Sequence, residues 1–263
     1  MIQSNVIQVV GNPHAVGKMK EIKESSSVIM LSGGIDSVSV LKRILEETDE
    51  KIYAHHIHIK NNTGAQYKRY KAEAEAVRKI VPYMKRTIRD FHYSESTVDI
   101  RQLINLLPTD IGEEDRPLSR SLFLADMTYY NFIGGMLAKI TQSPTIYTGT
   151  CKEDYTNSAN DNSETNSVLN RMKNGLKQLN ATSYPFEVTP RRPHDNQSKR
   201  ESIEYLGKEL MEMIWYCREP SFKNNKLITC IIKQEEQPNY QIYCCHACAL
   251  VRNALLEIEE GEE

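Results

Sequence analysis

Hydrophobic and polar positions follow two different periods along this chain. Residues 28–31, Val-Ile-Met-Leu, are apolar throughout, which predicts a buried strand. From Ser37 to Glu46 apolar residues recur at every third or fourth position, which predicts a helix. Residues 51–59 alternate with the period of a second strand. Similar patterns predict helices over 64–84, 120–141 and 198–213, strands over 85–91 and 144–150, and a polar loop over 157–167 followed by a helix to about Leu179.

The order of these segments predicts the fold class. Strands and helices alternate, which is typical of an α/β fold in which a doubly wound parallel sheet has helices on both faces. Ligands of such sheets bind beyond the carboxyl ends of the strands. Residues 32–37 and Gly149 each follow or end a predicted strand, so we expect them to lie near a ligand.

Length and composition narrow the class of protein. The chain has 263 residues, of which 40% are hydrophobic, and we expect a sheet domain over 1–213 with a cysteine-rich lobe, 214–263, packed on it. A formal net charge of −2 argues against binding nucleic acid through bulk electrostatics. No run approaches the ~18 apolar residues of a membrane span, and the first residues lack the pattern of a signal peptide. We therefore expect a cytoplasmic protein with no membrane partner.

Residues 32–37, Ser-Gly-Gly-Ile-Asp-Ser, form a glycine loop between the first predicted strand and helix. Small residues that enter a helix N-terminus present backbone N–H groups and the positive end of the helix dipole, which favour phosphate. The carboxylate of Asp36 suits such a site if it faces solvent and holds a Mg²⁺ ion that bridges phosphates. The spacings of a P-loop and of G-x-G-x-x-G are both absent. The alternative is a tight turn that requires glycine, with Asp36 as a helix-start residue.

Three more charged residues are candidates for the same site. Ser198 and Glu201 have the spacing of a capping box, which places Lys199 in the first turn of a helix. A cation is unfavourable there, so a functional role is favoured over a solvated side chain. Arg120 could bind a carboxylate or phosphate bidentately, or simply begin a helix. Asp154 could share Mg²⁺ with the glycine loop or be a turn residue.

Three histidines lie on the strand predicted over 51–59. His55 points to the opposite face from His56 and His58, and no carboxylate or cysteine is near them in sequence. We interpret them as strand surface or as the lining of a nucleotide site, rather than as metal ligands.

Five of the six cysteines lie in the last fifth of the chain, a clustering that indicates a metal rather than disulfides in a reducing compartment. Cys245-x-x-Cys248 has zinc-knuckle spacing. Cys217 and Cys230 would complete a closed, tetrahedral and therefore structural Cys₄ site. The alternative is that Cys230 is a small buried hydrophobe.

A hairpin would bring Cys230 to the other cysteines. The segment 226–233 alternates in the manner of a strand, and 240–244 returns after a turn. This hairpin would place Cys230 beside Cys244 or Cys245, and the pattern leaves the choice between those two ligands open.

The glycine loop resembles the pyrophosphate-binding loop of the N-type ATP pyrophosphatases, the family of GMP synthetase, NAD synthetase, asparagine synthetase and tRNA thiolases. These enzymes adenylate a substrate oxygen, release pyrophosphate, and let ammonia or sulfur displace AMP. The resemblance implies a Rossmann-type, adenine-nucleotide α-hydrolase-like fold for residues 1–213, with ATP as a ligand. The candidate nucleotide-binding residues are Ser32, Gly33, Gly34, Ile35, Asp36, Ser37, Gly149 and Asp154.

Further stretches resemble the 7-cyano-7-deazaguanine synthases of the queuosine pathway within that family. They are residues 115–125, 149–158, 214–220 and 244–255. The resemblance implies an ATP-dependent C–N ligase that joins the carboxylate of 7-carboxy-7-deazaguanine to ammonia, giving the amide and then the nitrile. It also implies a homodimer. The catalytic residues would be Asp36, Lys199 and Arg120, the cofactors ATP, Mg²⁺ and Zn²⁺, and the zinc ligands Cys217, Cys230, Cys245 and Cys248.

The acceptor substrate has alternatives, because residues 157–167 stand where those synthases have a Tyr-Pro-Asp-Cys-Arg stretch. The same adenylation could act on a tRNA base or a protein terminus. A nucleotide-binding protein without turnover is the alternative from another class.

Overall fold

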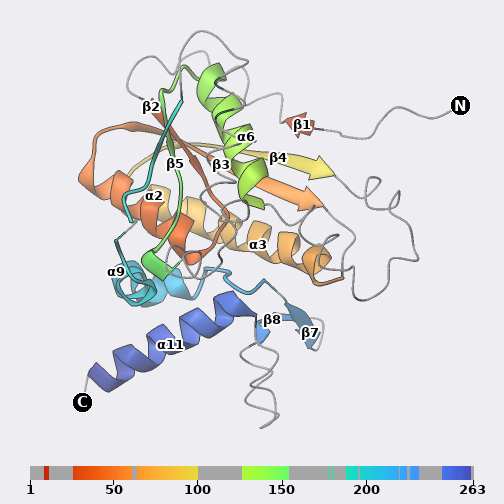
Figure 1. Cartoon of the computed structure of the whole chain (residues 1–263), viewed down its shortest axis with the longest axis vertical. Coiled ribbons are helices and arrows are strands. Elements are labelled where there is room, and N and C mark those ends of the chain that lie inside the picture. The colour runs from red at the N-terminus through yellow and green to blue at the C-terminus, as the bar shows by residue number, and fades with distance from the viewer. Residues whose placement is uncertain are drawn as a thin grey trace, which may run out of the picture.

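A central sheet with helices on both faces forms the body of the protein (Figure 1). The computed structural model describes residues 9–11, 26–60, 64–99, 126–153, 177, 180, 188–194, 196–218, 220–223, 226–230 and 245–261. Within these ranges no helix combines the length and the hydropathy that crossing a bilayer requires.

The main sheet has six strands in the order β1-β4-β3-β2-β5-β6. Five of them run parallel, and the short β1 pairs antiparallel with β4 at one edge. The strands are β1 (Val9–Gly11), β2 (Ser26–Met30), β3 (Lys51–Lys60), β4 (His92–Asp99), β5 (Thr145–Tyr147) and β6 (Thr189–Arg191). Chain order reverses between β2 and β5, and this reversal is the switch point at which doubly wound sheets bind ligands.

Helices cover both faces of this sheet, as the sequence predicted. They are α2 (Ile35–Glu47), α3 (Gly64–Thr87), α6 (Asp126–Ile140), α9 (Lys199–Met211) and α11 (His246–Gly261). Side chains of α2, α3, α9 and α11 pack with Ile29 and Ile52 in one core. On the other face, Tyr130 and Ile133 of α6 pack against Val28 and its neighbours. The fold class is therefore an α/β doubly wound parallel sheet.

The strand predicted over 85–91 is wrong. Helix α3 continues to Thr87, and the strand β4 begins only at His92. Serines occupy inward positions of β4, because the Oγ atoms of Ser94 and Ser96 lie 2.6 and 2.8 Å from the two ring nitrogens of His55. A buried polar contact of this kind removes the hydrophobic alternation by which a strand is recognised.

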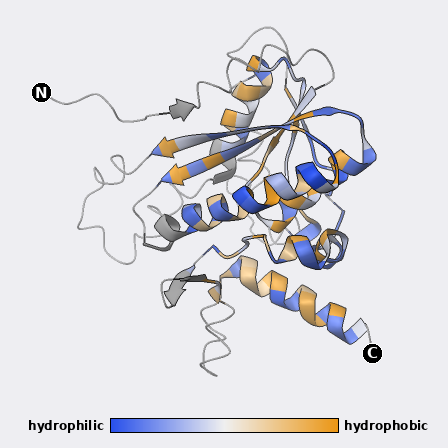
Figure 2. Ribbon diagram, turned by 180° about the vertical axis from the view of Figure 1, so that it is seen from behind, coloured by the Kyte–Doolittle hydropathy of each residue, from blue (hydrophilic) through white to orange (hydrophobic). Residues whose placement is uncertain are grey.

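The segment after α9 returns the chain to the main core. β7 (Ser221–Lys223) and β8 (Lys226–Ile228) form a small antiparallel hairpin. The first part of the strand predicted over 226–233 is present as β8, while residues 231–233 and the return strand predicted over 240–244 lie outside the described residues. In Figure 2 the last helix, α11, carries hydrophobic and hydrophilic residues along its length, and its Val251 and Ala254 are buried in the core that covers α2 and α9.

Candidate functional site

The glycine loop lies at the switch point of the sheet, between the end of β2 and the start of α2. Gly34 is the N-cap of α2 and offers no side chain to cap the first turn, so the N–H groups there are directed at any ligand. The hydroxyls of Ser32 and Ser37 lie 2.9 Å apart, and that of Ser37 donates to the carbonyl of Gly34. The side chain of Ile35 is buried in the core, so only its backbone could contact a nucleotide.

Gly33 holds the loop against α3. Its φ of +81° is in the left-handed region that favours glycine. A Cβ atom at Gly33 would also lie 3.0 Å from Cγ2 of Val77 and 3.1 Å from the carbonyl oxygen of Glu73. Both the backbone conformation and the packing therefore require glycine at this position.

Gly149 brings the end of β5 against the start of α2. A Cβ atom at this position would lie 2.5 Å from the backbone nitrogen of Ser37 and 2.7 Å from the carbonyl carbon of Asp36. The sequence therefore placed Gly149 beside the glycine loop correctly. Gly149 is a point of close backbone approach, and any side chain at this position would displace the first turn of α2.

Asp36 and Lys199 form an ion pair across the interface between α2 and α9. The Lys199 side chain is only 9% exposed, which excludes the alternative of a solvated lysine, and that of Asp36 is 27% exposed. The expectation that Asp36 faces only solvent and metal is corrected, because Lys199 occupies part of its carboxylate. One edge of that carboxylate remains accessible, which suits a ligand to Mg²⁺.

The capping box predicted for the start of α9 is confirmed. The backbone N–H of Ser198 donates to Glu201 at 2.7 Å, and Glu201 N–H donates back to the Ser198 hydroxyl at 3.2 Å. The backbone N–H of Lys199 donates to Oε1 of Glu153 at 2.9 Å, which ties α9 to the segment after β5. These contacts fix the direction in which the Lys199 side chain leaves the helix.

His194 is a member of this region that sequence reasoning missed. It is 1% exposed, and neither ring nitrogen has a hydrogen-bond partner among the described residues. Burial, with a smaller contribution from the positive charge of Arg43, lowers the pKa of His194 to about 4, while the negative charge of Asp36 opposes the shift. The imidazole is therefore neutral at pH 7 and within electrostatic reach of the Asp36–Lys199 pair. A lone histidine in a polar stretch carries no sequence pattern that could have identified it.

The histidines of β3 make hydrogen bonds within the sheet region. His55 and His56 are buried, so the interpretation as strand surface is wrong for both. The Nδ1 atom of His56 lies 2.8 Å from the carbonyl oxygen of Leu31, which directly precedes the glycine loop. Desolvation lowers the pKa values of His55 and His56 to about 3 and 4, and Nε2 of His58 lies 2.8 Å from Glu95.

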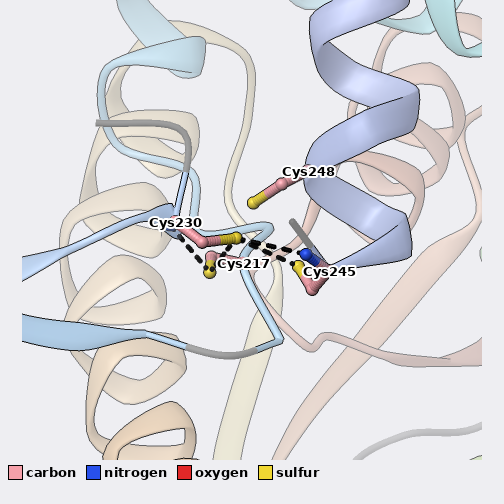
Figure 3. Close-up of side chains that lie close together, drawn as sticks. All are labelled: Cys217, Cys230, Cys245 and Cys248. Atoms are coloured by element: carbon pink, nitrogen blue, oxygen red, sulfur yellow. Dashed lines mark hydrogen bonds between the residues drawn. The ribbon is translucent and has the colours of Figure 1, made fainter. Parts of the chain in front are cut away.

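Four cysteines form a second site at the C-terminal end of the chain (Figure 3). We call Cys217, Cys230, Cys245 and Cys248 the cysteine cluster; their sulfur atoms all lie within 4.8 Å of one another. The sulfur atoms of Cys217 and Cys230, and those of Cys230 and Cys245, are 3.5 Å apart. That separation excludes a disulfide, whose S–S bond is ~2.05 Å. Four thiolates at a ~2.3 Å bond length around one ion would be roughly 3.8 Å apart, so the cluster fits a single tetrahedral metal.

Backbone amides stabilise negative charge on these sulfurs. N–H groups of Arg218, Cys230 and Cys245 donate to the sulfurs of Cys245, Cys217 and Cys230, each at 3.4 Å. Hydrogen bonds led by that from Cys217 hold the pKa values of Cys230 and Cys245 below the ordinary thiol value, that of Cys230 at about 6. Metal ligation requires thiolates, which this environment favours at Cys230 and Cys245, whereas hydrogen bonds to neighbouring cysteines raise the pKa values of Cys217 and Cys248. The choice left open in the sequence falls on Cys245, and Cys244 lies outside the described residues.

Two predicted site residues cannot be placed. Arg120 and Asp154 lie outside the described residues, as does the polar loop over 157–167. The described part of the site therefore comprises the glycine loop, Gly149, the Asp36–Lys199 pair and His194.

Comparisons with known proteins give weak likenesses. No family model matches the chain, and no curated protein matches it in sequence. The U34-tRNA thiolase NcsA from Methanococcus maripaludis, solved with its 4Fe-4S cluster, is similar in structure at 13% identity and a TM-score of 0.44, over 94% of this chain and 79% of that one. An NH₃-dependent NAD synthetase from Campylobacter jejuni matches at 12% identity and a TM-score of 0.32, over 94% and 93% of the two chains.

A glutamine-dependent NAD⁺ synthetase from Acinetobacter baumannii, in complex with ADP, matches at 12% identity and a TM-score of 0.32, over 66% of this chain and 32% of that one. These proteins belong to the enzyme types to which the glycine loop was likened. At such identities and TM-scores the likenesses carry no weight for function, which has to be inferred from the residues of this chain.

Proposed function

We propose that this protein is an ATP-dependent enzyme that transfers AMP to a substrate carboxylate and releases pyrophosphate. The observation that carries the proposal is the buried Lys199 ammonium, paired with Asp36 beside the glycine loop, at the switch point of a doubly wound sheet. A cation and a carboxylate held together next to uncapped N–H groups suit a magnesium–polyphosphate. The loop lacks the spacing of a P-loop, which favours cleavage at the α-phosphorus over transfer of the γ-phosphate.

The chain's own residues have separate roles in this proposal. N–H groups of the first turn of α2, with the hydroxyls of Ser32 and Ser37, hold the β- and γ-phosphates. Asp36 would ligate Mg²⁺, which would neutralise phosphate charge when bound. Lys199 stabilises the negative charge that develops on the leaving pyrophosphate. His194, with a pKa of about 4, is uncharged at pH 7 and adds no second positive charge beside the Asp36–Lys199 pair.

The reaction consists of two displacements. An oxygen of the substrate carboxylate attacks the α-phosphorus, the bond from that phosphorus to the bridging oxygen breaks, and pyrophosphate leaves. Ammonia then attacks the acyl carbon and AMP departs, which gives an amide and releases a proton. A second ATP could activate the amide oxygen in the same way, so that loss of AMP leaves a nitrile.

The acceptor we propose is a 7-deazaguanine carboxylate, with ammonia as the nitrogen donor. Support for it comes from the sequence resemblance over 115–125, 149–158 and the cysteine-rich end. Arg120 would bind the carboxylate, and Asp154 with the asparagines of 157–167 would pair with the base edge. Hydrogen bonds of that kind matter, since an unmatched buried polar group costs ~1–3 kcal/mol.

We propose that the metal of the cysteine cluster is zinc in a structural role. Sulfur atoms within 4.8 Å of one another suit one ion. Ligands of a four-iron cluster surround a larger core and must lie farther apart. A zinc ion with four thiolates is closed to substrate, and it contributes free energy of folding.

Product analysis tests the function. The full chain would be incubated with ATP, Mg²⁺, ammonium and 7-carboxy-7-deazaguanine, and the products identified by mass spectrometry. AMP, pyrophosphate and the 7-amido or 7-cyano base are expected. Formation of AMP and pyrophosphate without conversion of the base would favour a tRNA base or a protein terminus as the acceptor. ADP and orthophosphate would contradict the mechanism, and no turnover with any acceptor would favour a nucleotide-binding protein without catalysis.

A pair of variants tests the role of the Asp36 carboxylate in this assay. Asp36→Asn removes the carboxylate at the start of α2, whereas Asp49→Asn makes the same change at an exposed residue just beyond the other end of that helix. We expect the first variant to lose AMP formation and the second to retain it.

A further inference from the structure

Trp215 lies between the glycine loop and the cysteine cluster. Its backbone N–H donates to the carbonyl oxygen of Gly33 at 3.0 Å. A Cβ atom at Gly34 would lie 3.5 Å from the carbonyl oxygen of Trp215, so the backbone of this residue lies against the loop at both glycines. On its other side Trp215 is only two residues from Cys217.

The indole ring fixes this residue to the cysteine cluster. Its Nε1–H donates to the carbonyl oxygen of Cys217 at 2.8 Å. The ring also packs against the cysteine cluster and against the main core beneath α2 and α3. The metal-ligand residue Cys217 and the loop residue Gly33 are therefore joined through one side chain and one backbone amide.

The glycine loop has little freedom to compensate for a movement of Trp215. Gly33 has φ +81° and packs against Val77 and the carbonyl of Glu73. The peptide that follows its carbonyl group begins the turn into α2, where the phosphate-binding N–H groups lie. A shift of the hydrogen bond from Trp215 therefore changes the direction of those N–H groups.

We propose that Trp215 is a positioning residue that couples metal binding at the cysteine cluster to nucleotide binding at the glycine loop. This inference rests on the proposed function, because it takes the loop as the phosphate site and the cluster as a zinc site. Bound zinc would hold Cys217 in place, and the carbonyl oxygen of Cys217 accepts the hydrogen bond that orients the indole ring. The backbone N–H of Trp215 then holds the carbonyl group of Gly33. Coupling of two binding sites is reciprocal, so ATP must strengthen zinc retention by the same factor by which zinc strengthens ATP binding.

The experiment measures both halves of this coupling on the full chain. Calorimetry gives the affinity for ATP with Mg²⁺ in zinc-loaded and zinc-stripped protein, and competition with a chromophoric chelator gives zinc affinity with and without ATP. We expect both ratios to agree at about 5-fold or more. Trp215 is the single tryptophan of the chain, so the tryptophan fluorescence reports directly on the contacts of Trp215 with Gly33 and Cys217. This fluorescence should change when either ATP or zinc binds.

Two variants at adjacent positions isolate the indole. Trp215→Phe keeps an aromatic ring but removes the Nε1–H, and with zinc bound it should weaken ATP binding roughly 2- to 10-fold, the equivalent of one hydrogen bond. In this variant ATP should also lose its effect on zinc release. Tyr216→Phe is the matched control: Tyr216 packs against the same two clusters, but its change leaves both bonds of Trp215 in place. The control should keep the coupling of the wild type.

The outcomes separate this inference from the proposed function. Zinc-loaded wild type that does not bind ATP overturns the proposed function itself. Protein that binds ATP equally with and without zinc, and retains zinc equally with and without ATP, overturns only the coupling. If stripped protein unfolds, the zinc-loaded variants decide: equal ATP affinity and equal zinc release in wild type and Trp215→Phe would reject the role of Trp215.

Discussion

The glycine loop and the cysteine cluster differ in what holds their residues in place. The loop is one continuous stretch between a buried strand and a helix, and its shape is fixed by the sheet, by α3 behind Gly33 and by the close approach of Gly149. The cysteine cluster gathers residues from three separate places in the chain, next to a hairpin of two three-residue strands. Among the residues that the structure describes, the apolar side chains packed against the four sulfurs are those of Trp215, Tyr216 and Ala247.

This difference indicates which of the two sites requires a bound ligand to keep its structure. A phosphate loop on a packed sheet is preorganised, and its ligand adds affinity without forming the site. Four thiolates this close together repel one another once deprotonated, so under the proposed function the cysteine cluster depends on its metal for stability. The predictions below test this contrast, beginning with the largest expected effect.

Removal of zinc should unfold the cysteine-rich end and leave most of the sheet folded. Structural zinc contributes ~10–16 kcal/mol in zinc-finger peptides, and we expect Cys217→Ser to lower the free energy of unfolding by roughly 5 kcal/mol. Hydrogen exchange should locate the loss at 214–230 and at the start of α11. Cys151→Ser, which changes the buried cysteine outside the cluster, should leave one zinc per chain by elemental analysis. Absence of zinc from protein purified without chelator would contradict the assignment.

Loss of the Lys199 charge should affect catalysis more than stability. Lys199→Met removes the cation proposed for the leaving pyrophosphate, and AMP formation should fall by about 10²–10³-fold, as for loss of one preorganised stabilising group. Asp36→Asn should in addition destabilise the fold by roughly 1–3 kcal/mol. The reason is that a largely buried ammonium then lacks its partner; a fully buried pair would cost ~3–5 kcal/mol.

The control for this prediction is the variant Lys208→Met, because Lys208 is an exposed lysine on the same helix. Initial rates of AMP release and urea unfolding curves measure the two effects separately. A Lys199→Met enzyme with wild-type turnover would show that the ion pair is only structural.

Substitutions at two glycines separate the packing that holds the glycine loop in place from the surface of the loop that would contact phosphates. Gly149→Ala places a Cβ atom 2.5 Å from the backbone nitrogen of Ser37, so the start of α2 must move, and we expect a loss of roughly 1–3 kcal/mol in stability together with weaker ATP binding. Gly34→Ala meets nothing closer than 3.4 Å. It should therefore keep wild-type stability within ~0.5 kcal/mol and still weaken ATP binding, because the methyl group stands where phosphates approach. Equal ATP affinity in Gly34→Ala and wild type would argue against this loop as the phosphate site.

The parts of this structure that were predictable from sequence are those set by local patterns. β2, α2 and β3 followed from buried aliphatic residues at regular spacing, and the gathering of four cysteines followed from their clustering near the end of the sequence. β4 was missed because Ser94 and Ser96 take inward positions. β6 was missed because it is only three residues long and contains Pro190.

Contacts between distant segments were not predictable in the same way. The Asp36–Lys199 pair joins residues 163 positions apart, and it exists only because α9 docks on α2. The two residues were recognised one by one, from a loop motif and from an unfavourable lysine at a helix start. Their pairing, and the buried His194 beside them, needed the tertiary structure.

The smallest expected effect concerns protons, and it separates the two regions once more. The pKa of His194 is about 4 in the folded protein, against ~6.5 when unfolded, so the unfolded state binds more protons between these values. Stability must therefore rise as pH increases from about 4 to 6.5 and level off above.

The contribution of His194 to the change in the free energy of unfolding between pH 7 and pH 6 should be below ~1 kcal/mol. The variant His194→Gln should remove this contribution. His55 and His56, whose pKa values are also lowered, change the stability in the same direction. If the cysteine cluster holds zinc as proposed, it should release the ion as protons neutralise its thiolates. Urea unfolding curves and zinc content measured on the same samples distinguish the two: a flatter curve in His194→Gln at unchanged zinc content assigns the slope to the sheet region, and an unchanged curve would mean that His194 is not buried as a neutral group.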